Sequence, residues 1–210
     1  MHAMSLIDGS VRDLLTAFSS SDPTPGGGSA AALASAVGAA LLTMVAGLPK
    51  TRSGSDADRQ ALAAAIGSLT ETRQQLTAAI DADRVAYDRV VAAYKLARGT
   101  DEEKSVRKTA IQRALRGAID VPLQVMRLSA RALEAAPAVA AHAHPGASSD
   151  VGVAVALLRC GLRGARLNVD INLASVHDAT YTSAVGAEVD RLTGAATTAA
   201  EAAEAALAAG

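Results

Sequence analysis

Apolar residues recur at three- and four-residue intervals over most of the chain, which is the spacing of one face of a helix. No stretch shows the convincing alternation of apolar and polar residues that marks a half-buried strand. Polar, proline and glycine segments interrupt the helical pattern. The pattern therefore predicts one short helix followed by five long ones, over 10–18, 29–48, 56–97, 101–137, 150–176 and 177–208.

Several of these limits have a local cause. Ser10 and Asp13 have the spacing of a capping box, which predicts a helix start. Gly99 and Thr100 break the pattern between the third and fourth helices. Pro122 is expected to kink or divide the fourth helix, and Pro137 to end it, because proline lacks an N–H group and clashes with the preceding turn.

The uncharged run over 29–48 is long enough to span a bilayer. Ala, Gly and Ser make it only weakly lipophilic, and it lacks flanking basic clusters and an aromatic belt. It also follows a charged segment and a Pro/Gly loop, which is not typical of a secretory signal. We expect a central helix buried on all sides, no membrane partner and a cytoplasmic location.

The composition agrees with a single helical domain over residues 1–210. Half of the residues are hydrophobic and 20% are charged, as in a globular protein. Aromatic residues make up only 2%, which disfavours a strand-rich fold, and abundant Ala favours closely packed helices. The expected fold class is all-α: a bundle of long antiparallel helices with a buried central Ala/Gly-rich helix.

Charge and cysteine content narrow the function classes. A net charge of −1 removes the electrostatic argument for a nucleic-acid partner, and scarce aromatics disfavour a stacking platform for single strands. Cys160 is the single cysteine, so no internal disulfide forms and a reducing compartment is the simplest context. Because Cys160 lies in an apolar run, we expect a buried, inert thiol.

Gly26, Gly27 and Gly28 follow two prolines and lead into the central helix. Three consecutive glycines cost chain entropy and normally have a backbone reason. They can present N–H groups to an anion at the helix N-terminus, or form a tight turn that lets the helix approach its neighbours. The spacing alone does not choose between these two interpretations.

Asp83 and Tyr87 lie on one face of the predicted 56–97 helix, together with apolar residues. A carboxylate on such a face would be partly desolvated, which raises its pKa and suits proton transfer. The alternative is a solvated Asp83 at the edge of the stripe, paired with Arg84 or Arg59. The pattern alone favours this alternative.

Other polar groups admit two interpretations each. Ser149 and Asp150 precede an apolar helix, where an ordinary N-cap is the simpler explanation. Asn168 and Asn172 are one turn apart, so their amides can bind a heterocycle or tie neighbouring helices together. The histidines have no zinc-site spacing and are expected in solvent-exposed loops; no metal site is predicted.

Five segments, taken in order, resemble the folate cyclodeaminase/cyclohydrolase family. They are PTPGGGSAAALASAVGAAL (23–41), DRVAYDRVVAAYK (83–95), AIDVPLQVM (118–126), SSDVGVA (148–154) and LNVDINL (167–173). The first is the most specific, and the resemblance covers nearly the whole chain. The resemblance implies an all-α protein, typically a homodimer, which binds a reduced folate where long helices and partner subunits meet and needs no metal or redox cofactor.

The resemblance also implies roles for individual residues. Asp83 matches the family carboxylate and is the expected acid/base group, with Asp150 second. The expected substrate-binding residues are Gly26, Gly27, Gly28, Tyr87, Lys95, Ser149, Asn168 and Asn172. The chain departs from the family pattern at His144 and Gly146, where asparagines are usual, and this affects one expected contact to the pterin or the amide region of the substrate.

The expected function is hydrolysis of methenyltetrahydrofolate to 10-formyltetrahydrofolate. A cyclodeaminase that releases ammonia from formiminotetrahydrofolate is the alternative, since the same acid/base group serves both reactions. A third hypothesis is a non-catalytic helical folate-binding or scaffold protein, motivated by the two missing asparagines.

Overall fold

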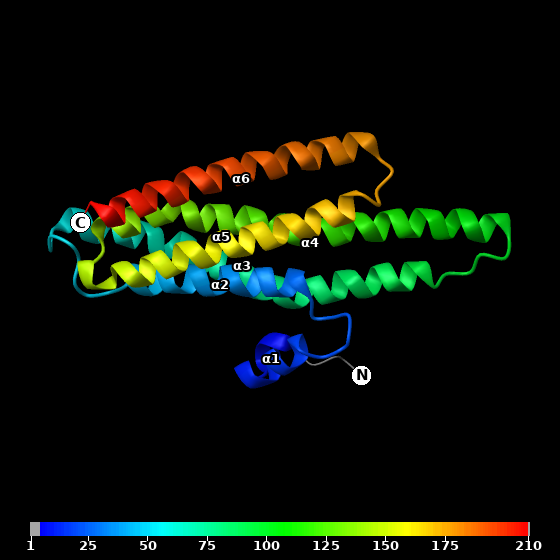
Figure 1. Cartoon of the computed structure of the whole chain (residues 1–210), viewed down its shortest axis with the longest axis horizontal. Coiled ribbons are helices and arrows are strands. Elements are labelled where there is room, and N and C mark those ends of the chain that lie inside the picture. Colours follow the sequence, from blue (N-terminus) through cyan, green and yellow to red (C-terminus); the bar gives the residue numbers. More distant parts are fainter. Residues whose placement is uncertain (1–4, 210) are drawn as a thin grey trace.

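The computed structural model describes residues 5–209, and this part of the chain is helical, without a β-strand. The prediction of an all-α bundle is confirmed. The elements are η1 (Leu6–Asp8), α1 (Val11–Phe18), α2 (Gly27–Ala46), α3 (Asp56–Tyr94), α4 (Asp101–His142), η2 (Pro145–Ala147), α5 (Ser148–Leu173) and α6 (Ala179–Ala208). In Figure 1 the long helices α2 to α6 lie side by side, with α1 set beside the bundle.

Helix α2 is the central helix, as predicted. It packs against α3, α4 and α5, and its contacts with α5 are the most extensive in the molecule. The two backbones approach closely at Gly161, where a Cβ would lie 2.6 Å from the carbonyl oxygen of Ala31. Ser35 and Ser129 share a buried hydrogen bond of 2.7 Å between α2 and α4. Small residues therefore bring these helices together.

The burial of α2 is incomplete. Its length and composition are those of a membrane span, but 56% of its most apolar window is buried inside the protein. Val37 and Met44 are 43% and 47% exposed on the outer side of the helix. The prediction of a helix buried on all sides is therefore wrong for this side, where an apolar surface remains uncovered.

The long α4 contains both prolines that were expected to interrupt it. Pro122 and Pro137 lie inside one helix, which continues to His142 instead of ending near Pro137. Side chains of Ile119, Leu123 and Met126 are buried on both sides of Pro122. Tertiary packing therefore holds the helix through the positions at which local propensity would end it.

Two further residues, His142 and Cys160, differ from expectation. His142 ends α4, and its Nδ1 lies 2.8 Å from an oxygen of the buried Asp58, so it is not a free loop histidine. The His142 ring and donors from Ser53 hold the pKa of Asp58 well below its usual range. Cys160 is exposed, so the expected buried thiol is not found.

Candidate functional site

The carboxylate of Asp83 lies against the first turn of α2. Gly26 is the N-cap of this helix and has no side chain to satisfy the first N–H groups. Asp83, which reaches across from α3, takes that role: its Oδ2 accepts the backbone N–H of Ser29 at 3.0 Å. The Ser29 hydroxyl donates to the carbonyl of Ile80 at 2.8 Å and lies 3.3 Å from the same Asp83 oxygen.

Gly28 gives this arrangement its space. A Cβ at this position would overlap the Asp83 carboxylate, so only glycine lets the side chain lie against the helix. The first of the two interpretations of the glycine run, anion binding at the N-terminus of α2, applies here to an anion of the protein itself. The second interpretation, a close approach of the helix to its neighbours, also applies at Gly28, where α2 and α3 meet.

Asp83 is not the solvated, paired carboxylate of the simpler alternative. Arg59 pairs with Asp56 instead. Among residues 5–209, Oδ1 of Asp83 receives no hydrogen bond. Burial raises the pKa of Asp83, and the two hydrogen bonds from Ser29 only partly offset this effect. The folded protein therefore makes this carboxylate a stronger base than an ordinary aspartate.

Asn168 joins this site from α5. Its amide nitrogen donates to the carbonyl of Gly164 in its own helix at 2.9 Å. The same nitrogen would lie 3.6 Å from a Cβ at Gly27. Asn168, Gly27, Gly28 and Asp83 thus come together from three helices, while Tyr87 lies one turn beyond Asp83 and is 39% exposed.

Asn172 has a structural partner. Its amide nitrogen donates to the carbonyl oxygen of Ala118 on α4 at 3.1 Å. Pro122 stands four residues after Ala118 and has no N–H to bond that carbonyl. Asn172 therefore ties α5 to α4 and satisfies the group that the proline leaves open.

Three predicted site residues lie elsewhere in the subunit. Asp150 is eighteen residues from Asn168 along α5, about 27 Å at ~1.5 Å per residue. Ser149 is beside it, and neither is the N-cap: Ala147 holds that position without a side-chain bond, so the capping prediction is wrong. Lys95 is exposed at the end of α3, twelve residues and about 18 Å beyond Asp83.

Ser29 is the residue of this site that the sequence analysis missed. It is fully buried, and its backbone N–H and its hydroxyl both form hydrogen bonds with α3. Its place directly after the glycine run was the available signal. Asp81, two residues before Asp83 and on the other side of α3, accepts hydrogen bonds from Ser5 and Leu6 and fixes the segment before α1.

Asp83 does not line any of five grooves on the surface of residues 5–209. One of them, about 720 Å³, begins at Ala86, one turn away. No group of three His, Cys, Asp or Glu side chains within the described residues is placed to hold a metal ion. Within one subunit, α2, α3 and α5 therefore form one side of the candidate site.

Two known proteins with similar sequences are folate enzymes by name. A methenyltetrahydrofolate cyclohydrolase from Methylorubrum extorquens is 39% identical over 171 residues, covering 81% of this chain and 82% of that protein. The formimidoyltransferase-cyclodeaminase of Rattus norvegicus is 34% identical over 174 residues, 83% of this chain but 32% of that longer protein.

A solved structure shares the fold, and a family model matches most of the chain. The structure of a formiminotetrahydrofolate cyclodeaminase from Thermotoga maritima superposes with a TM-score of 0.86 over 98% of both chains, at 22% identity, and so shares the fold. The family model described as formiminotransferase-cyclodeaminase matches residues 10–191. The chain belongs to the formiminotransferase-cyclodeaminase family.

Proposed function

We propose that this protein is a methenyltetrahydrofolate cyclohydrolase in which Asp83 is the acid/base residue. The observation that carries the proposal is the Asp83 carboxylate itself, held at Gly28 and Ser29 with a raised pKa and with no hydrogen bond to Oδ1 from residues 5–209. The name of the Methylorubrum extorquens relative, which matches at similar length, supports hydrolysis.

The chemistry requires a base and a counter-charge. The methenyl bridge is an amidinium cation, and its carbon is attacked by water. Asp83 takes a proton from the water as the C–O bond forms, and its negative charge stabilises the cation. It then returns this proton to N5 as the C–N5 bond breaks. The hydroxyl proton leaves to solvent when the formyl C=O forms, which gives 10-formyltetrahydrofolate.

Cyclodeamination is the second candidate, favoured by the names of the rat and Thermotoga maritima proteins. Here N10 attacks the carbon of the protonated formimino group on N5. Asp83 takes the proton from N10 and gives it to the nitrogen that leaves as ammonia when the methenyl bridge forms. The products separate the two reactions. A cyclohydrolase removes the absorbance of methenyltetrahydrofolate without ammonia, whereas a cyclodeaminase releases ammonia from formiminotetrahydrofolate.

Asp83→Asn tests the catalytic role, with Asp88→Asn as a matched control on the same helix. Asp88 is exposed. Loss of a positioned acid/base group lowers turnover about 10²–10⁴-fold, so Asp83→Asn should lose activity on both folates while Asp88→Asn keeps it. A folded Asp83→Asn protein with wild-type turnover would refute the proposal, and a wild type without turnover or folate affinity would favour the scaffold hypothesis.

The proposal includes a homodimer that forms across α2 and α5. Exposed apolar side chains follow one side of each helix: Val37 and Met44 on α2, and Val153, Leu167 and Ile171 on α5. The two helices are neighbours, so these residues form one uncovered apolar strip. Val37→Glu should give a monomer in sedimentation experiments, whereas Val106→Glu, at an exposed valine of α4, should not.

A two-fold dimer of this kind brings the separated residues together. An axis near Val37, at the middle of α2, makes the two copies of α2 antiparallel. The start of one α2, with Gly28 and Asp83, then faces the end of the other α2. The antiparallel α5 places Ser149 and Asp150 at that end. We propose that these two residues complete the folate site from the partner subunit.

A further inference from the structure

Positive charge is concentrated at one end of the bundle. Residues 84–116 form the end of α3, the following turn and the first part of α4. They include nine Lys or Arg and four Asp or Glu, a formal charge of +5 in a chain whose net charge is −1. This local excess is unrelated to Asp83, which lies before it on α3.

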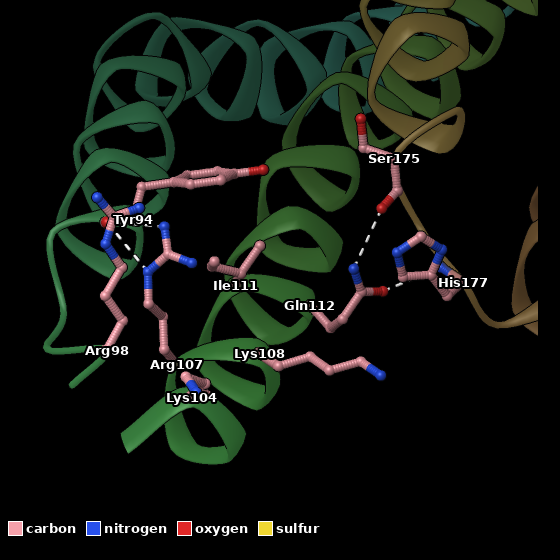
Figure 2. Close-up of a pocket in the computed structure, with 9 residues that line it drawn as sticks. All are labelled: Tyr94, Arg98, Lys104, Arg107, Lys108, Ile111, Gln112, Ser175 and His177. Carbon is pink, nitrogen blue, oxygen red and sulfur yellow. Dashed lines mark hydrogen bonds between the residues drawn. The ribbon is translucent and has the colours of Figure 1, made fainter. Parts of the chain in front are cut away.

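A groove of about 560 Å³ opens among these cations. Its lining includes Tyr94, Arg98, Lys104, Arg107, Lys108 and His177. Figure 2 shows Tyr94 and the arginines on one side and the Gln112–His177 pair on the other. The buried Ile111 also lines the groove. The groove therefore combines several positive charges with an aromatic and an apolar surface.

Hydrogen bonds hold both sides of the groove in place. The guanidinium of Arg107 donates twice to the carbonyl oxygen of Tyr94, at 3.1 and 3.3 Å, and lies 5.6 Å from the centre of the Tyr94 ring. On the opposite side, Gln112 donates to the carbonyl of Ser175 at 3.1 Å and accepts the backbone N–H of His177 at 3.0 Å. The loop after α5 is thereby fixed against α4 (Figure 2).

The nearby carboxylates leave most of this charge unbalanced. Asp101 pairs with Lys104 at 2.8 Å. The Glu103 carboxylate accepts the backbone N–H groups of Gly99 and Thr100. Within residues 5–209 no carboxylate forms an ion pair with Arg98, Arg107 or Lys108. Three cations around one hollow therefore remain available to an external anion.

We propose that this groove binds a small, multiply charged anion that carries two or more phosphate or carboxylate groups. Charge-assisted hydrogen bonds from Arg98, Arg107 and Lys108 would hold it. Tyr94 lies eleven residues beyond Asp83, about 16 Å along α3, so the anion site is separate from the proposed catalytic carboxylate. The proposal therefore does not depend on the proposed reaction.

Calorimetric titration of the full chain with tripolyphosphate and with citrate, at low ionic strength, tests the proposal. The test variant is Arg98→Ala/Lys108→Ala. The control is Arg12→Ala/Lys50→Ala, which removes the same charge at exposed positions outside the groove. Two lost charge-assisted contacts should weaken binding about tenfold or more in the test variant, with a change of no more than about twofold in the control.

The two probes identify the source of the anion. Binding of tripolyphosphate alone assigns the groove to a phosphate ligand, and binding of citrate alone to a carboxylate ligand; either supports the proposal when the test variant weakens it. Binding of neither probe overturns it. An equal loss of affinity in both double variants also overturns it, because net charge and not the groove would then attract the anion. Circular dichroism checks that both variants are folded.

Discussion

At the residue scale, Gly28 controls where the Asp83 carboxylate can lie. A methyl group at this position would overlap that carboxylate, so Gly28→Ala must displace the side chain or the helix. We expect a loss of about 1–3 kcal/mol in the free energy of unfolding, as for other overpacked sites, together with reduced turnover. Urea unfolding and the folate assay measure the two effects.

Gly67→Ala is the control for this substitution. Gly67 is an exposed residue of α3, and a Cβ there would meet no atom within 4 Å. Because alanine is the better helix former, Gly67→Ala should gain about 0.5–1 kcal/mol and leave turnover unchanged. If Gly28→Ala also gained stability and kept its turnover, the close contact between Gly28 and Asp83 would contribute to neither stability nor activity.

The raised pKa of Asp83 gives a second prediction at this scale. Burial favours the protonated form in the folded state, so ionised Asp83 lowers stability as the pH rises through its folded-state pKa. Asp83→Asn removes the charge and keeps an oxygen that can accept the Ser29 N–H. The variant should therefore be at least as stable as the wild type at pH 8, with a difference that shrinks towards acid pH.

Unfolding free energies measured in urea between pH 4 and 8 check this sign. The exposed Asp88→Asn control should show a difference that varies little with pH. A wild type that gains stability over Asp83→Asn as the pH rises would mean that the hydrogen bonds from Ser29 outweigh the burial of the carboxylate.

At the scale of elements, Asn172 and Pro122 act as a pair. The Asn172 amide satisfies the Ala118 carbonyl, which Pro122 cannot reach. We expect Asn172→Ala to lose about 1–2 kcal/mol of stability because it leaves a half-buried carbonyl unpaired. Pro122→Ala restores an N–H, so the same Asn172→Ala change should cost about 1 kcal/mol less in that background. Additive effects in this double-mutant cycle would contradict the pairing.

This pair also shows where prediction from sequence stops. The apolar periodicity placed every long helix, and the capping box at Ser10 and Asp13 is present. The expected end of α4 near Pro137 was wrong, because packing against α3, α5 and α6 outweighs the local effect of proline. Such compensation comes from residues distant in the chain, and local patterns do not contain it.

The candidate site, too, could be predicted from the sequence only in part. The spacing placed Asp83 on a partly apolar face, but the pattern alone favoured a solvated carboxylate. The pKa of Asp83, raised by burial, agrees with the other interpretation, a partly desolvated carboxylate. Its partner Ser29 is 54 residues away, so the contact depends on how α2 and α3 pack. The separation of Asp150 from Asn168 follows from helix length alone once both are known to lie on α5.

At the scale of the whole molecule, the apolar strip on α2 and α5 and the separation of Asp83 from Asp150 have one common explanation. Each subunit of the proposed dimer would supply Asp83 to one site and Asp150 to the other. Asp83→Asn and Asp150→Asn homodimers should then both be inactive, since every site lacks one carboxylate. A mixed dimer has one doubly substituted site and one intact site.

Co-refolding the two variants in equal amounts distinguishes a shared site from a site within one subunit. Random pairing makes about half of the dimers mixed, each with one intact site of two, so about a quarter of wild-type activity should return. The unmixed variants, refolded in the same way, are the controls. If Asp150 instead acted within its own subunit, mixing would restore no activity. If Asp150 had no role, the Asp150→Asn variant alone would stay active. Either result would contradict a site shared across the antiparallel dimer.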